Sequence, residues 1–238
     1  MTRLRQAIGT PAGKGPYVRR LFATIAPHYD LITVLLSYGQ DRRWKRRLLA
    51  MALPLEGRRV LDLACGTGDI ALGAAVGGAQ VVGLDLTPAM IALARSRAGQ
   101  GPAPRFLVGD MLSLPFPDAA FDVVTIGYGL RNVPDLSRAL AEAHRVLRSG
   151  GRLLSLDFNK PRSALVRAAY HVYLTVTGSM LGAILHGDPD TYRYIAESLR
   201  TYPGAEAVAD RMTAEGFAAA RWHPVLGGLL AIHLAERR

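Results

Sequence analysis

The chain contains a single cysteine, Cys65, among its 238 residues. One thiol cannot build a disulfide framework or a cysteine-based zinc site, so we expect a reducing compartment. The spacing of the six histidines does not suggest a metal site either, and we expect no metal. Charged residues make up only 20% of the sequence, whereas half of the residues are hydrophobic. This composition excludes a disordered chain and predicts a sizeable core. Basic residues at the start are not followed by an apolar run, so we expect no secretory signal.

The first 55 residues have few acidic side chains. They contain ten Lys and Arg but only two Asp, a formal charge of +8 out of +10 for the whole chain. A basic lobe fits a nucleic acid, an anionic membrane surface or an acidic substrate, and it also fits a plain solvated face. Trp44 lies within the basic segment 42–47, four residues before Leu48. This pattern is typical of an amphipathic helix at a membrane interface, and it would also suit phosphate contacts.

Residues 168–187 contain no Asp, Glu, Lys or Arg. Twenty residues are about the length of a membrane span. The stretch also contains His171, His186, two tyrosines and two internal glycines, which argues against a transmembrane helix. We therefore expect a buried helix or a flexible lid over an apolar ligand, as an enzyme that handles a lipid would need.

Short apolar runs alternate with helical stretches after residue 58. The runs predict buried strands at 60–64, 81–86, 105–110, 121–126 and 152–158. An amphipathic helix is expected at 135–148, ended by Gly150. This alternation predicts an α/β fold with a mostly parallel sheet and helices on both faces. Two apolar runs around Gly227 and Gly228 predict an antiparallel hairpin that completes the sheet.

The same pattern divides the chain into four parts. Residues 1–55 form a basic helical lobe, with helix breaks near Pro27 and at 37–39, that covers the substrate or contacts a membrane. Residues 56–160 form the cofactor-binding core, 161–215 a helical lid insertion and 216–238 the C-terminal hairpin.

A glycine-rich loop follows the first expected strand. Gly66, Gly68 and Ala71 give the G-x-G-x-x-A form of nucleotide-like cofactor sites, which is a weak signal by itself. Asp85 ends the next strand, where a carboxylate can accept hydrogen bonds from the ribose hydroxyls of NAD or S-adenosylmethionine. Asp62 favours the second, because an acid before the loop repels a pyrophosphate and attracts a sulfonium and an ammonium. A strand-end acid bonded to loop amides is the alternative for Asp62.

Further candidates follow the third and fourth expected strands. Asp110 is placed to accept the adenine amino group and Met111 to pack on the ring, although a turn acid and a core methionine would give the same pattern. Arg131 and Asn132 follow the fourth strand, at the edge where open α/β sheets bind ligands. The structural alternatives are an ion-pair partner for Arg131 and a helix cap for Asn132.

Longer motifs make the chain resemble the UbiE-type family of menaquinone and ubiquinone biosynthesis C-methyltransferases, which are class I S-adenosylmethionine-dependent methyltransferases. The glycine loop is generic to that superfamily, whereas GLRNV at 129–133 and YRYIAES at 192–198 are much more specific. The resemblance extends from Tyr29 to the last residues. It implies a Rossmann-like fold with a mostly parallel seven-stranded sheet.

The resemblance also implies a cofactor site for S-adenosylmethionine. With the residues of the glycine loop included, the predicted cofactor site consists of Asp62, Gly66, Thr67, Gly68, Asp85, Leu86, Asp110, Met111 and Gly127. Gly127 departs from the serine often found in the family, so only its backbone could contact the cofactor. Asp157 replaces a frequent glutamate, which keeps the charge but shortens its reach.

The family's substrate is an isoprenoid-tailed quinol, and this agrees with the uncharged stretch and the basic lobe. A ring carbon becomes nucleophilic when an ortho hydroxyl ionises. Arg131 cannot act as a base, so we expect it to stabilise the developing oxyanion. We expect Asn132 to orient a ring oxygen and Tyr29 to cover the site and bond the second hydroxyl. Asp157, His171 and His186 compete as the base.

Three alternatives stay open at this point. An RNA methyltransferase would use the basic lobe, although no Asn-Pro-Pro-Tyr motif is present. A small-molecule phenol methyltransferase and a membrane-attached subunit without catalytic activity are the others. We expect a quinol substrate, no nucleic acid, and a cytoplasmic protein in peripheral contact with an anionic membrane surface. A homodimer and the choice between menaquinol and ubiquinol precursors are left open.

Overall fold

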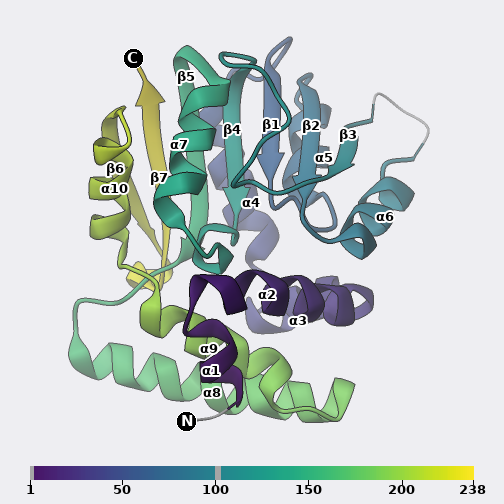
Figure 1. Cartoon of the computed structure of the whole chain (residues 1–238), viewed down its shortest axis with the longest axis vertical. Coiled ribbons are helices and arrows are strands. Elements are labelled where there is room, and N and C mark those ends of the chain that lie inside the picture. Colours follow the sequence, from purple (N-terminus) through teal and green to yellow (C-terminus); the bar gives the residue numbers. More distant parts are fainter. Residues whose placement is uncertain (1–2, 100–102) are drawn as a thin grey trace.

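A seven-stranded sheet forms the upper part of the molecule, and a layer of helices lies below it (Figure 1). The computed structural model describes residues 3–99 and 103–238. The strand order is β3-β2-β1-β4-β5-β7-β6. The strands are β1 (Arg59–Leu63), β2 (Gln80–Asp85), β3 (Arg105–Val108), β4 (Phe121–Gly127), β5 (Leu147–Phe158), β6 (Phe217–Val225) and β7 (Leu230–Arg237). Strands β1 to β5 pair in parallel, and β7 is antiparallel to both neighbours. The predicted α/β fold with its C-terminal antiparallel hairpin is confirmed.

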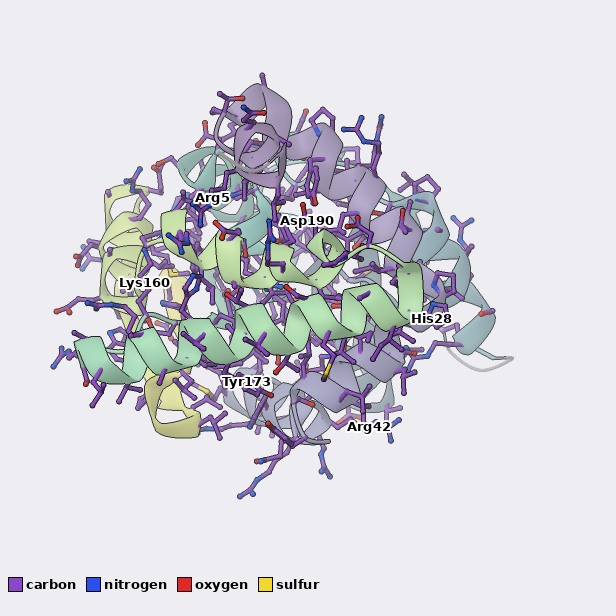
Figure 2. All side chains as sticks on the ribbon, turned by 90° about the horizontal axis from the view of Figure 1, so that it is seen from below. Arg5, His28, Arg42, Lys160, Tyr173 and Asp190 are labelled. Carbon is purple, nitrogen blue, oxygen red and sulfur yellow. The ribbon has the colours of Figure 1, made fainter. Side chains whose placement is uncertain are left out.

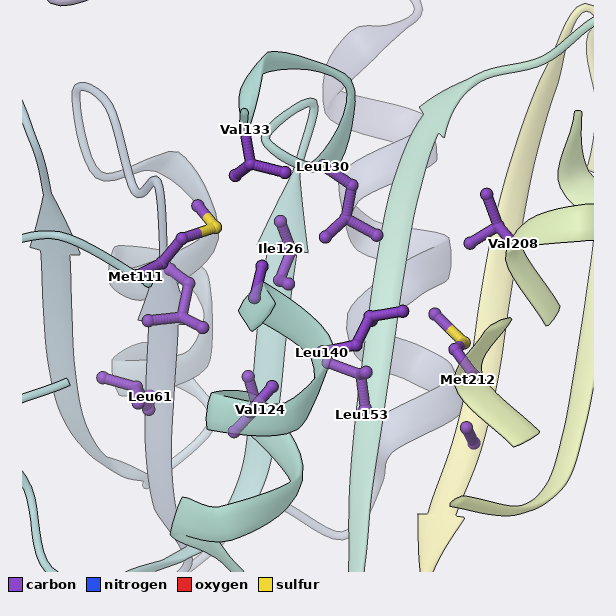
Figure 3. Close-up of a cluster of buried hydrophobic side chains, with 14 of the residues drawn as sticks. Leu61, Met111, Val124, Ile126, Leu130, Val133, Leu140, Leu153, Val208 and Met212 are labelled. Carbon is purple, nitrogen blue, oxygen red and sulfur yellow. The ribbon is translucent and has the colours of Figure 1, made fainter. Parts of the chain in front are cut away.

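Helices cover both faces of the sheet, because side chains along each buried strand alternate between two cores. Helices α4 (Asp41–Ala52), α5 (Asp69–Val76) and α6 (Pro88–Arg97) pack on the face that carries Val60 and Leu154. Helices α7 (Leu136–Val146) and α10 (Ala205–Ala214) pack on the face that carries Leu61 and Leu153. Figure 3 shows this second core, where Leu140 of α7 and Met212 of α10 lie against the strands.

The helix predicted at 135–148 extends two residues too far at its C-terminal end. Helix α7 ends at Val146, and Leu147 already pairs with Phe121 of β4. Leu147 is fully buried in this extended conformation, so strand pairing ends the helix before Gly150 can do so. Gly150 instead lies within β5, with a φ of +72°.

The lower layer combines the N-terminal helices with a segment from the second half of the chain (Figure 1). It contains α1 (Arg3–Ile8), α2 (Pro11–Ile25), η1 (Ala26–His28), α3 (Tyr29–Leu36), α8 (Ala164–His186) and α9 (Asp190–Thr201). Apolar side chains of α1 to α3 pack with Tyr192 and Tyr194 of α9. Arg5 of α1 forms a two-bond ion pair with Glu197 of α9. The breaks expected near Pro27 and at 37–39 are present as η1 and a turn. The predicted lid insertion, residues 161–215, is divided between two places. Helices α8 and α9 lie in the lower layer, whereas α10 packs on β6 and β7.

Helix α8 is long and apolar enough to cross a membrane by length and composition. One narrow face, formed by Leu174, Gly178 and Gly182, is buried against α9. A Cβ on Gly178 would lie 2.8 Å from the carbonyl oxygen of Tyr192, so glycine allows this close packing. Most of the opposite face is exposed, and α8 is therefore not the buried helix that was one of the two expectations.

Candidate functional site

Two neighbouring cavities lie between the sheet and the lower layer. The larger, of about 540 Å³, is lined mainly by apolar side chains of α2, α3, α8 and α9. The other lies at the carboxyl ends of β1, β2 and β4, where the strand order reverses and open α/β sheets bind ligands. Phe22, Tyr29 and Tyr128 line both cavities. We call them the large cavity and the strand-end cavity.

The strand-end cavity brings together six of the nine predicted cofactor residues: Gly66, Asp85, Leu86, Asp110, Met111 and Gly127. Asp62 and Thr67 line a small adjoining space together with Lys45. Gly68 lines none of these spaces. It has a φ of +89° and precedes α5, and a Cβ there would lie 2.9 Å from Phe106, so its role is conformational.

The charges of the strand-end cavity suit a cationic ligand. Asp85 accepts hydrogen bonds from the amides of Gly66 at 2.9 Å and Thr87 at 2.8 Å, which leaves each oxygen free to accept another. Burial raises the pKa of Asp85. Asp110 is exposed at the other end, and no Lys or Arg lines the cavity among residues 3–99 and 103–238. These residues fit S-adenosylmethionine, which supplies a methyl group on a sulfonium, and they disfavour a pyrophosphate.

Asp62 lies underneath the glycine loop. Its carboxylate accepts hydrogen bonds from Thr125 Oγ1 at 2.7 Å and from the amide of Ala71 at 3.1 Å. That amide belongs to the first turn of α5, whose preceding residue, Gly68, has no capping side chain. Burial raises the pKa of Asp62 to about 7, although both hydrogen bonds lower it. This geometry fits the strand-end acid bonded to loop amides, and a contact between Asp62 and the donor stays a prediction.

Arg131 lies in the wall of the large cavity. Its Nη1 contacts Asp157 Oδ1 at 2.9 Å and the carbonyl oxygen of Tyr128 at 2.9 Å. The guanidinium lies 4.7 Å from the ring centroid of Phe158. Its Nε is buried, and the described residues offer it no hydrogen-bond partner. Arg131 is therefore held by its neighbours with an unsatisfied donor, as an anion-stabilising group needs to be.

Asn132 and Tyr29 lie close to the boundary between the cavities. The amide of Asn132 donates to the carbonyl oxygen of Tyr128 and accepts from the hydroxyl of Tyr194. Its side chain thus adjoins the strand-end cavity and not the large one. Tyr29 lines both cavities, and burial raises the pKa of its phenol.

The three expected bases lie outside the lining of the large cavity. Asp157 is 1% exposed and accepts from the Arg131 guanidinium and from two backbone amides. His171 contacts Arg200, and His186 contacts the hydroxyl of Tyr192. Asp157 is thus placed to position Arg131. Both histidines contact neighbouring side chains of the helical layer instead of lining the large cavity.

The sequence did not single out Asp41, Lys45 or Tyr128. Tyr128 lines both cavities and donates a hydrogen bond to Asp41 Oδ1 at 2.8 Å. Lys45 Nζ lies 2.5 Å from Asp41 Oδ2 and 2.8 Å from Asp69 Oδ2. Although burial lowers the pKa of Lys45, the carboxylates raise it above its usual range. The only signal in the sequence is that Asp41 is a single acid at the start of a strongly basic segment. The net charge of that segment hides it.

Trp44 is buried and lines the large cavity, so it is not the surface tryptophan of an interfacial helix. Its neighbours Arg42, Arg43, Arg46 and Arg47 are exposed. The cluster therefore has two sides, with Trp44 and Lys45 facing inward and the arginines facing outward.

A chain of polar contacts joins the lower layer to the glycine loop. Arg97 of α6 contacts Asp69 at 2.6 Å and Asp30 of α3 at 3.3 Å, and it donates to the carbonyl oxygen of Thr67. Thr67 Oγ1 donates to Asp30 at 2.7 Å. This chain holds α3 over the edge of the cofactor site.

The sheet order and the acidic strand-end cavity define a class I S-adenosylmethionine-dependent methyltransferase. The fold is shared with solved structures of this class. One is a methyltransferase from Thermotoga maritima, described as a possible histamine N-methyltransferase, with a TM-score of 0.68, 20% identity, and coverage of 93% of this chain and 100% of that one. Another is a Haemonchus contortus methyltransferase in complex with phosphomonomethylethanolamine and S-adenosylhomocysteine, with a TM-score of 0.63, 16% identity, and coverage of 82% and 52%.

The chain belongs to the ubiE/COQ5 methyltransferase family, whose model matches residues 11–237. It is 45% identical to the demethylmenaquinone methyltransferase of Thermus thermophilus over 91% of this chain and 100% of the relative. It is 41% identical to the enzyme of the same name from Deinococcus radiodurans over 98% of both chains. Identity to the ubiquinone/menaquinone biosynthesis C-methyltransferase UbiE of Azotobacter vinelandii is 39%, over 92% of this chain and 89% of that protein.

Proposed function

We propose that the enzyme transfers a methyl group from S-adenosylmethionine to a ring carbon of a polyprenylated quinol, with demethylmenaquinol as the principal substrate. The observation that carries this proposal is the large apolar cavity, which adjoins the donor site and has room for an aromatic ring and the start of a tail. The names of the two bacterial demethylmenaquinone methyltransferases support the choice of ring.

Within this reaction, Arg131 faces the ring oxygen that gains negative charge. Asp157 and the carbonyl oxygen of Tyr128 fix the direction of the guanidinium. Tyr29 lies where the ring must approach the methyl group, and it excludes water from that point. Asp85 and Asp110 hold the adenosine part of the donor.

The test is an anaerobic assay with labelled S-adenosylmethionine and a short-tailed demethylmenaquinol kept reduced. We expect a product heavier by one methyl group that carries the label. The oxidised quinone is the matched control, and it should stay unlabelled because it has no hydroxyl to ionise. A benzoquinol precursor measures the ubiquinone branch. Labelling of RNA but of no quinol would overturn the proposal.

We also propose that the lower face docks on an anionic membrane. Large apolar side chains are exposed on α3 and α8: Leu31, Val34, Leu35, Leu165, Val166, Val172, Val176, Met180 and Ile184. We call these residues the apolar stripe. Leu165 and Val166 also line the large cavity, so the stripe is continuous with its opening. Seen from below, α8 lies in the foreground with Arg42 beside the same face (Figure 2). Arginine beside an exposed apolar face matches an anionic lipid surface.

Sedimentation with vesicles tests the docking face. Wild-type protein should bind vesicles that contain anionic lipid more strongly than neutral ones. Val176→Asp with Ile184→Asp should abolish binding, whereas Val76→Asp, at another exposed valine remote from the stripe, should not. If the stripe instead joins two copies of the chain, the variant will change the molecular mass in solution without changing vesicle binding, and the docking proposal is then wrong.

A further inference from the structure

The large cavity has few groups that could remove a proton. Among its lining residues in the described parts of the chain, Asp41 is the only carboxylate and Arg131 the only cation. The remaining lining groups are apolar side chains, aliphatic hydroxyls and phenols. A neutral phenol and a guanidinium are poor proton acceptors, so Asp41 carries the one lining side chain of a type that serves as a general base.

Asp41 is held in the wall of the large cavity. It is 3% exposed, at the start of α4. Its Oδ1 accepts the hydrogen bond from Tyr128, and its Oδ2 contacts Lys45. Tyr128 directly follows β4 and has a φ of +59°, in the left-handed region that residues other than glycine seldom adopt. This unusual backbone conformation directs a phenol between the donor site and the large cavity.

We propose that Asp41 is the proton acceptor for the ring hydroxyl, with Tyr128 as the relay between them. This proposal rests on the proposed quinol methylation. The ring hydroxyl gives its proton to the Tyr128 oxygen while Tyr128 passes its own proton to Asp41 Oδ1. The electron pair of the broken O–H bond stays on the ring oxygen opposite Arg131 and increases electron density at the ortho carbon.

Methyl transfer follows the removal of this proton. The ortho carbon forms its bond to the methyl group as the carbon–sulfur bond breaks, and that electron pair stays on sulfur. The methylated carbon then loses its hydrogen as a proton to water, and aromaticity returns with the negative charge on the ring oxygen. Asp41 passes its proton back through Tyr128 to that oxygen, which restores the hydroxyl. One proton is released for each methyl group transferred.

The charged and titratable groups around Asp41 and Tyr128 come from the helix of Asp41 and from three other elements. Lys45 on the same helix contacts the Asp41 carboxylate, and it also contacts Asp69 of α5 at 2.8 Å. Arg131 of η2 (Leu130–Asn132) lies 5.9 Å from the Tyr128 ring centroid. Tyr29 of α3 lines the same spaces. Burial, reinforced by Asp41, holds the pKa of Tyr128 well above its usual range, so this phenol passes a proton on without becoming a phenolate.

The experiment compares Asp41→Asn, Tyr128→Phe and the double variant with the wild type. The readouts are kcat for methyl transfer to a short-tailed quinol from pH 6 to pH 10, and the Kd of the donor. We expect each single variant to lose about 100-fold in kcat at neutral pH, a typical contribution of general-base catalysis. The rate of each variant should then rise about tenfold per pH unit, since the ring hydroxyl must ionise without help. The double variant should be no slower than either single one, because the two residues act as a unit.

Asp69→Asn is the matched control, because it removes the other carboxylate on Lys45 but does not line the large cavity. It should keep the pH dependence of the wild type. Tyr128→Phe loses one hydroxyl only and gives the same test if Asp41→Asn does not fold. Wild-type rates in either single variant, or an equal loss at every pH, would overturn the relay. A wild type that methylates no quinol would instead overturn the proposed function.

Discussion

The guanidinium of Arg131 and the carboxylate of Asp157 lie 2.9 Å apart, and their side chains are only 7% and 1% exposed. The pair joins the segment after β4 to the end of β5, beside the wall of the large cavity. A buried ion pair is costly to form, and it is much more costly to lose one partner of it. The two residues are therefore expected to behave as a unit in stability as well as in catalysis.

A double-mutant cycle measures this coupling. Arg131→Met leaves Asp157 buried and unpaired, and we expect it to lower the free energy of unfolding by about 3–5 kcal/mol. Asp157→Asn should cost a similar amount, since it leaves a buried guanidinium. The double variant should lose clearly less than the sum of the two. Urea unfolding provides the three values, and strict additivity would contradict the coupling.

Arg131→Lys separates charge from geometry. Lysine keeps the positive charge but has no planar fork with which to contact Asp157 and the ring oxygen together. We expect kcat to fall at least about tenfold, while the Kd of S-adenosylmethionine changes less than twofold. Single-turnover rates and calorimetric titration give the two quantities. An equal loss in both would show that Arg131 supports the donor site and not the transition state.

The fold could be predicted closely because its signals are local. Apolar runs of strand length alternate with helical stretches, and each of the five predicted parallel strands overlaps an observed one. The error at the end of α7 has a tertiary cause, because Leu147 extends to pair with Phe121. The exposed face of α8 could not be deduced from its composition, since an uncharged helix looks alike whether it is buried or faces a membrane.

The pKa of Asp62 predicts an unusual pH dependence of stability. Its folded-state pKa of about 7 lies above the ordinary value for an aspartate, so its contribution is fully present below pH ~4 and is lost as the pH rises through 7. The wild type should therefore lose stability between about pH 4 and pH 7 relative to Asp62→Asn. Thermal unfolding of both proteins without the donor, across this range, gives the comparison. Parallel curves would mean that Asp62 is ionised at little cost.

Two glycines beside the donor site provide a matched steric test. A Cβ on Gly129 would lie 2.8 Å from both Ala64 Cβ and Ile126 Cγ2, which are held in the packed core. A Cβ on Gly127 would meet only the mobile end of Ile70. Gly129→Ala should cost about 1–3 kcal/mol of stability and weaken donor binding, whereas Gly127→Ala should cost less. Thermal unfolding and donor titration of both variants would reveal any reversal of this order.

The site was less predictable than the fold. Strand-end residues such as Asp85 and Asp110 could be identified because the carboxyl ends of parallel strands meet at one edge. Asp41 could not, since it lies outside the core segment and reaches the cavity only through the packing of α4 on one face of the sheet. The predicted bases were chosen by residue type alone. In the structure, Asp157 contacts Arg131, and both histidines contact residues of the helical layer.

Gly15, Val18 and Phe22 of α2 roof the strand-end cavity, and this has a consequence for turnover. We expect α2 to lift when the spent donor leaves, so that product release and the opening of the N-terminal segment share one barrier. Protease cleavage within the first 25 residues should therefore slow when S-adenosylhomocysteine is bound. The enzyme would then idle as a closed complex whenever its by-product accumulates, which makes the removal of that by-product a natural control on quinone synthesis.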